Sequence, residues 1–80
     1  MITTQQIRSA RTILGWTQKQ LSDAAGLSQM SVKNIERGAT PDPRAGTISA
    51  LQQALEAGGV EFVGETSRAG RGVRLRTDRS

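Results

Sequence analysis

The segment Gln18–Arg37 constrains the fold of this chain more than any other part, because it places two short helical patterns around one glycine, Gly26. Glycine readily adopts the left-handed backbone conformation that ends a helix in a tight turn. Apolar residues recur on both sides of it at the spacing of one helix face, which predicts two helices that bury this face together. The predicted buried positions are Leu21, Ala25, Leu27, Val32 and Ile35. The residues predicted to face outward are Gln18, Gln29, Met30, Lys33 and Asn34.

The composition limits the chemistry that the chain can perform. It has 80 residues, enough for one domain, and contains neither cysteine nor histidine. This excludes disulfides, thiolate and imidazole metal sites, and nucleophiles that need a Cys or His partner. The carboxylates Asp23, Glu36, Asp42 and Glu56 are set apart along the predicted elements, with no visible carboxylate pair. The sequence therefore predicts a protein that is not an enzyme and has no cofactor, metal site or small-molecule ligand.

The charge of the chain favours a polyanionic partner. Eleven basic and seven acidic residues give a net charge of +4 and a pI near 11.2, which suits nucleic acid. Residues 60–80 hold five arginines against three acids, so the C-terminal segment is strongly basic. No apolar run reaches the length of a signal peptide or a membrane span. The sequence predicts a soluble, cytoplasmic protein that does not contact membranes.

Capping signals mark where three helices begin. Thr3 with Gln6, and again Thr17 with Gln20, have the spacing of a capping box, and Ser28 provides a third N-cap. Combined with the apolar periodicity, these signals set the helix starts, and glycines mark the helix ends. The predicted helices are Thr4–Leu14, Gln18–Ala25 and Gln29–Arg37.

A fourth helix is predicted to reach about Ala57. Asp42 is its expected N-cap, with Pro43 at the first helical position. Because Gly46 in the helix interior would cost about 1 kcal/mol, a start at Thr47 is the alternative. The predicted buried face of this helix comprises Ile48, Leu51, Ala54 and Leu55.

After Gly59 the apolar period shortens to two residues. Val60–Val63 and Val73–Arg76 are alternating runs separated by a glycine-containing segment, which predicts an antiparallel hairpin. The alternative is a disordered arginine-rich tail, since a lone two-stranded hairpin is marginally stable and would leave Phe62 and Leu75 exposed. A second chain could cover them. The predicted organisation is a domain over residues 1–59 and a hairpin with a basic tail over 60–80, a candidate dimerisation element.

Taken together, the segment from Ile7 to Leu55 closely resembles the helix-turn-helix domain of the Cro and lambda-repressor-like family, also called XRE. The matching elements are Thr17-Gln18, Leu21, Gly26-Leu27-Ser28-Gln29, Val32 and Ile35-Glu36-Arg37-Gly38. Ser22 departs from the alanine that is usual at its position, which bears on local packing. The resemblance implies a mainly α fold, a lambda-repressor-like helix-turn-helix bundle of four or five helices, here followed by a C-terminal β-hairpin.

The resemblance also implies which side chains contact DNA. The helix after Gly26 would enter the major groove, where its outward side chains reach base edges. The residues expected to contact bases are Gln29, Met30, Lys33 and Asn34. Those expected to contact the DNA backbone are Gln18, Ser28, Ser31 and Arg37. In the family an arginine of the first helix pairs with a glutamate near the end of the third, which predicts a structural pair of Arg11 with Glu36. Trp16 is interpreted as a packing residue rather than a base-stacking one.

The function implied is that of a sequence-specific regulator of transcription that binds double-stranded DNA. We expect a repressor that acts as a homodimer on an inverted-repeat operator, because one such module buries too little surface for tight, selective binding. The alternative is a protein-interaction module, such as an antitoxin-like or antiactivator partner that retains the fold. A non-specific nucleic-acid binder driven by the arginine-rich tail is a third reading, and it would lack a preference for one operator.

Overall fold

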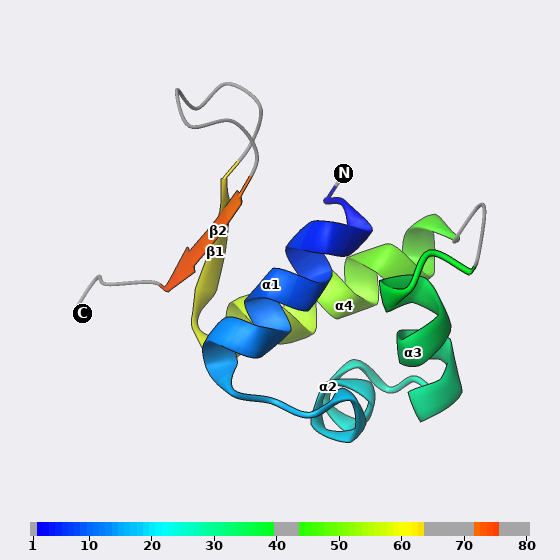
Figure 1. The fold of residues 1–80 in the computed structure, drawn as a ribbon. Coiled ribbons are helices and arrows are strands. Elements are labelled where there is room, and N and C mark those ends of the chain that lie inside the picture. Colours follow the sequence, from blue (N-terminus) through cyan, green and yellow to red (C-terminus); the bar gives the residue numbers. More distant parts are fainter. Residues whose placement is uncertain (1, 40–43, 64–71, 76–80) are drawn as a thin grey trace.

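The computed structural model describes residues 2–39, 44–63 and 72–75 of the chain, and these form four helices and a two-stranded hairpin. The elements are α1 (Thr4–Leu14), α2 (Gln18–Ala25), α3 (Gln29–Glu36), α4 (Ala45–Gly58), β1 (Val60–Val63) and β2 (Gly72–Leu75). α1 packs along α4, α2 and α3 close one side of this pair, and the hairpin lies on the side away from α3 (Figure 1). The predicted mainly α bundle with a C-terminal hairpin is confirmed. Among these residues no helix has the length and apolar character that a bilayer span requires.

Local capping explains why the first helices begin where they do. The Thr3 hydroxyl accepts from the backbone N–H of Gln6, and the Gln6 side chain accepts from the backbone N–H of Thr3. α2 has the same reciprocal box, and the bounds of both helices are those predicted. Ser28 caps α3, which ends at Glu36, one residue earlier than predicted, with Arg37 as its C-cap. Gly26 has φ +71°, the left-handed conformation expected at the turn between α2 and α3.

The fourth helix differs from both predicted starts. It begins at Ala45, with Arg44 in the N-cap position and no side-chain cap. Asp42 and Pro43 lie outside the described residues, and Gly46 is inside the helix, so the alternative start at Thr47 is wrong. Gly46 stands in the first turn, where the backbone N–H groups have no partner within the helix and a glycine weakens the ladder less than in the middle. The predicted buried face is confirmed: Ile48, Leu51, Ala54 and Leu55 are all buried.

All four helices and β1 contribute to one hydrophobic core. Its fully buried large side chains are Ile7, Leu21, Val32, Leu51, Leu55 and Val60. Of the residues predicted to be buried around the turn, Ile35 is also buried, whereas Ala25 and Leu27 are only partly buried against the core. Ser22 is buried too, and its hydroxyl donates to the carbonyl of Lys19 at 2.7 Å. A serine fits this small-residue position because its own helix satisfies the hydroxyl.

The hairpin packs against the helices of its own chain. β1 and β2 are antiparallel, with Val60 opposite Leu75 and Phe62 opposite Val73. Val60 is fully buried in the helical core, and both Phe62 and Val73 are partly buried against it. The predicted hairpin is thus confirmed over the described strands, with Arg76 outside them. The helices of the same chain support the hairpin, so Phe62 is already partly covered without a second chain.

Gln6 fastens the hairpin to α1. Besides its capping bond, the buried Gln6 side chain donates through Nε2 to the carbonyl oxygens of Val63 at 3.3 Å and Gly72 at 2.9 Å. One amide therefore holds both strands and the start of α1 at the same time. The sequence pattern revealed only the capping role of Gln6, because the other two partners are 57 and 66 residues away.

The end of α4 lies directly against Trp16. A Cβ atom on Gly58 would lie 2.8 Å from two carbons of the Trp16 ring and 2.9 Å from a methyl carbon of Leu14. Atoms cannot approach this closely without displacement, so the missing side chain lets the ring cover the last turn of α4. Trp16 is a packing residue, as predicted.

Candidate nucleic-acid interface

α3 presents a row of outward side chains opposite its buried side. Val32 and Ile35 are in the core, so helical geometry turns Gln29, Met30 and Lys33 to solvent. Met30 is 61% exposed, an unusual position for a large apolar side chain. Of the four residues predicted to contact bases, three are therefore fully available on one helix, and the fourth, Asn34, is half-buried at the margin of the row.

The N-terminal end of α3 carries two hydroxyls that bond to each other. Ser28 accepts from the backbone N–H of Ser31 at 3.1 Å, and its hydroxyl donates to the Ser31 hydroxyl at 2.9 Å. Ser28 is exposed and Ser31 is half-buried. A hydroxyl has one proton and two lone pairs, so Ser31 keeps its own proton for an acceptor such as a phosphate oxygen. The two residues predicted to contact the DNA backbone thus lie beside the first residues of the outward row of α3.

Gln18, the first residue of α2, is not simply outward as predicted. It is half-buried, and its Nε2 donates to Oε1 of Glu36 at 3.1 Å, across to the end of α3. A side-chain amide nitrogen carries two protons, so one N–H of Gln18 remains for a phosphate oxygen. Glu36 thereby orients the group that is expected to contact the DNA backbone. Sequence reasoning missed this contact because no spacing rule links residues 18 and 36.

The predicted pair of Arg11 and Glu36 is confirmed and is bidentate. Nε of Arg11 lies 2.7 Å from Oε2 of Glu36, and Nη2 lies 3.1 Å from Oε1. The remaining Nη1 donates to the carbonyl of Trp16 at 2.8 Å. The Glu36 side chain is only 4% exposed, yet both of its oxygens have donors. This cluster, which we call the Glu36 network (Arg11, Trp16, Gln18 and Glu36), joins α1, α2 and α3 at the end of the outward row of α3.

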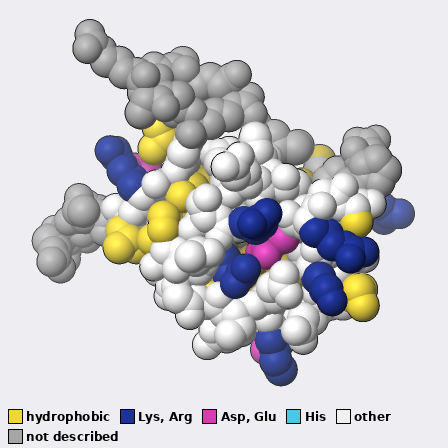
Figure 2. Space-filling view, in the orientation of Figure 1, with side chains coloured by type: hydrophobic (Ala, Val, Ile, Leu, Met, Phe, Trp, Pro, Cys, Tyr) yellow, Lys and Arg dark blue, Asp and Glu magenta, His cyan; other side chains and the backbone are white. Residues whose placement is uncertain are grey.

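The basic side chains of the described residues divide into paired and unpaired sets. Arg11, Lys19 and Arg74 are in ion pairs with Glu36, Asp23 and Glu61. Exposed residues with no ion-pair partner in the described part of the chain are Arg8, Lys33, Arg37 and Arg44. Figure 2 shows Lys and Arg side chains gathered around an acidic group near the middle of one face. Such a face has the electrostatic character that attracts a polyanion.

What the site can do chemically follows from its groups. Amides, hydroxyls, a thioether and unpaired cations can bind nucleic acid, but they include no nucleophile with a paired base. Within the described ranges there is also no cluster of three or more acidic side chains that could hold a metal ion. These side chains are suited to binding the surface of a macromolecule such as nucleic acid.

The fold and the arrangement of α2 and α3 define a helix-turn-helix protein, and a family comparison agrees. Residues 7–62 match the helix-turn-helix family model, and the chain belongs to this family, the XRE type. It is also similar to a protein of Sinorhizobium fredii, strain NGR234, described as an uncharacterized HTH-type transcriptional regulator, y4dL. The two are 40% identical over 53 residues, which make up 66% of this chain and 26% of the relative. The chain thus spans about a quarter of the length of that relative.

Proposed function

We propose that this protein is a DNA-binding regulator of transcription that reads its operator with α3 in the major groove. The observation that carries the proposal is the outward row of α3, in which Gln29, Met30 and Lys33 are exposed while the opposite side is buried and the helix end is held by the Glu36 network. A helix that reads bases must be held rigidly, because a side chain can make a bidentate contact to a base edge only when its backbone is fixed in position. The family and the name of the relative support the same function.

The proposed contacts divide between bases and backbone. Gln29 opens α3 and has the amide geometry for adenine N6 and N7, and Met30 can contact a thymine methyl. Lys33 and Asn34 would reach bases further along the groove. Gln18, Ser28, Ser31 and Arg37 would bond phosphate oxygens and set the register of the protein on the duplex.

We further propose a homodimer on an inverted repeat that acts in the cytoplasm, most simply as a repressor. A single module of this kind buries limited surface on DNA, and a two-fold dimer doubles the contact. Two exposed apolar side chains support an interface between copies: Leu75 of β2 is 51% exposed, and Ile13 of α1 is 40% exposed. Both lie away from α3, so such a dimer would leave the outward row of α3 free.

Selection of bound duplexes from a random pool tests the function directly. We expect one enriched inverted repeat, and Gln29→Ala should lose about 1–3 kcal/mol of discrimination at one position of each half-site. The matched control is Gln53→Ala, a change of an exposed glutamine on α4, which should leave the preference unchanged. The proposal is wrong if no sequence is enriched. The role of Gln29 is wrong if the variant loses equal affinity for operator and random DNA.

A further inference from the structure

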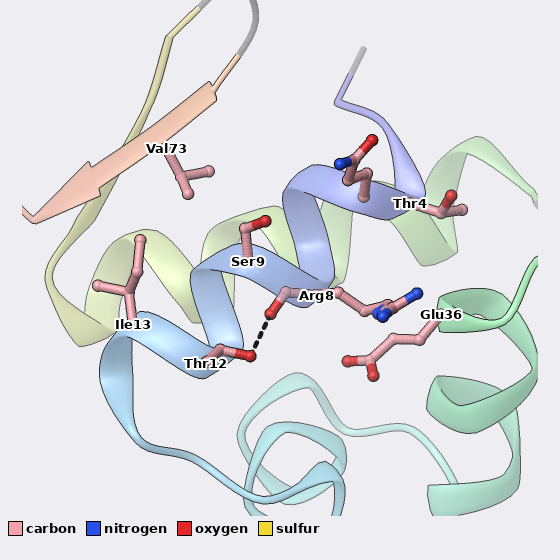
Figure 3. Close-up of a pocket in the computed structure, with 8 residues that line it drawn as sticks. Thr4, Arg8, Ser9, Thr12, Ile13, Glu36 and Val73 are labelled. Atoms are coloured by element: carbon pink, nitrogen blue, oxygen red, sulfur yellow. Dashed lines mark hydrogen bonds between the residues drawn. The ribbon is translucent and has the colours of Figure 1, made fainter.

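The unpaired basic surface extends from α3 onto α1, through Arg8. This exposed residue is one turn before Arg11 on α1. Its guanidinium extends toward the end of α3, where Glu36 lies (Figure 3). Arg8 and Glu36 line one end of an open groove of about 700 Å³ that runs along α1. Ile13 and Val73 line the other end of the groove (Figure 3).

Arg8 does not serve as a partner of Glu36. Oε2 of Glu36 accepts from Arg11, and Oε1 accepts from both Arg11 and Gln18. The side chain of Arg8 makes no hydrogen bond or ion pair with any residue that the structure describes; apart from the bonds of the helix backbone, the residue only accepts from the Thr12 hydroxyl, at its carbonyl oxygen and at 2.9 Å. The guanidinium therefore lies at the groove with its five N–H donors unpaired among the described residues.

The local charge at this place is positive. Arg11 neutralises Glu36, which leaves Arg8 and, directly after Glu36 in the chain, Arg37 without an acidic partner among the described residues. Thr4 and Ser9 add hydroxyl donors to the lining of the same groove. A planar guanidinium with free N–H donors matches the geometry of phosphate oxygens.

We propose that Arg8 contacts a backbone phosphate of the operator, so that the DNA-binding surface includes α1 as well as α2 and α3. The phosphate would belong to the strand that passes the C-terminal end of α3. This inference deepens the proposed function and rests on it. The contact is independent of sequence, and its role is to fix the angle at which α3 enters the groove, together with Gln18 at the other side of the Glu36 network.

The test is Arg8→Gln in the full chain, measured by fluorescence anisotropy on the selected operator and on a random duplex of equal length over a series of salt concentrations. We expect affinity to fall by the same factor on both duplexes. The slope of log K against log salt should become shallower by about 0.9 for each bound subunit, and therefore by about 1.8 for the proposed dimer, because each copy loses one phosphate contact. The control is Arg74→Gln, which removes the same charge from the hairpin, where Arg74 pairs with Glu61 at 2.6 Å; its slope should match that of the unmodified protein.

Three outcomes would overturn the Arg8 contact: an unchanged slope in Arg8→Gln, an equal change in Arg74→Gln, or a loss confined to one base pair of the operator. Thermal unfolding checks that both variants fold, and we expect melting temperatures equal to that of the unmodified protein, because neither side chain is buried. The proposed function fails separately, if the unmodified protein shows no preference for any operator. The slope on random DNA would still decide the Arg8 contact in that case.

Discussion

Gln6 and Gln18 show how much a single side-chain amide contributes to this fold. Gln6 accepts from the start of α1 and donates to both strands of the hairpin. Gln18 begins α2 and donates to the last residue of α3. Each amide joins segments that are distant in the sequence, and a buried amide that loses its partners costs about 1–3 kcal/mol. These residues therefore determine positions of whole elements.

The dual role of Gln6 leads to a prediction for Gln6→Glu. A glutamate preserves the capping box, since its oxygen still accepts from Thr3, but it has no proton for the carbonyls of Val63 and Gly72. We expect the free energy of unfolding to fall by about 1–3 kcal/mol, which is the cost of leaving a buried polar group without its hydrogen-bond partner. Amide hydrogen exchange in β1 should accelerate more than exchange in α2.

The matched control is Gln20→Glu at the corresponding capping position of α2. Gln20 is exposed and makes its capping bonds with Thr17, and its side-chain nitrogen has no partner among the described residues. This variant should stay within about 0.5 kcal/mol of the unmodified protein, as surface substitutions usually do. Equal losses in both glutamate variants would contradict the role of Gln6 in holding the hairpin.

At the scale of elements, α2 and α3 are too short to be stable alone. Each has eight residues, and isolated helices below about 12–15 residues are marginal in water. Their orientation depends on the core and on the Glu36 network, which bonds the end of α3 to α1 and to the start of α2. A change in that network should thus alter the positions of elements as well as local contacts.

Arg11→Ala tests how strongly the network joins α1 to α3. The change leaves the carboxylate of Glu36 buried without its cation, which costs about 3–5 kcal/mol. Adding Glu36→Gln removes the unpaired charge, so we expect the double variant to be more stable than Arg11→Ala alone. Urea denaturation of the four proteins of the cycle should give a coupling energy of about 0.5–3 kcal/mol.

The exposed pair of Lys19 and Asp23 provides the comparison. It lies on the surface of α2 with an N–O distance of 3.1 Å, and surface pairs contribute about 0–1 kcal/mol. Lys19→Ala should therefore have little effect on stability. If the changes at Arg11 and Glu36 are strictly additive, the two side chains do not act as a pair in solution.

At the scale of the whole molecule, the hairpin belongs to the same core as the helices. Val60 is fully buried among them, so truncation after Gly59 would remove a core residue and would not isolate the helical part cleanly. Phe62 also packs on the helices, and its replacement would damage the monomer. Among the apolar side chains of the described strands, Leu75 can be changed with little harm to the monomer, since it is half exposed.

Leu75→Ser therefore tests the proposed dimer. We expect analytical ultracentrifugation to show a weaker monomer–dimer equilibrium, because the change removes an apolar side chain from the interface and preserves all charges. Affinity for an operator with two half-sites should fall, whereas affinity for a duplex with one half-site should stay the same. If sedimentation and both affinities equal those of the unmodified protein, the hairpin is not the interface, and the exposed face of α4 becomes the candidate.

The sequence allowed prediction of features that depend on neighbouring residues or on a family pattern. The capping boxes of α1 and α2 join residues three positions apart, so their spacing alone indicated the helix starts. The Arg11–Glu36 pair was predicted from the family resemblance. The start of α4 was not, because its N-cap residue, Arg44, makes no capping bond that could mark it. The base and backbone contacts on DNA stay predictions.

Residue order by itself determined the first two helices, the turn at Gly26, the alternating strands and the polar outer side of α3, because each depends on hydrogen bonds or periodicity within a few residues. Only the tertiary structure decided which distant groups the side chains contact. It gave Gln6 the hairpin carbonyls, directed Gln18 to Glu36, packed Phe62 partly against helices of its own chain and left Arg8 without a side-chain partner in the described residues. The physical reason is that a long-range hydrogen bond forms only with a group that the folded core brings to about 3 Å from the side chain. The packing of that core depends on many weak contacts along the whole chain, which no short stretch of sequence specifies.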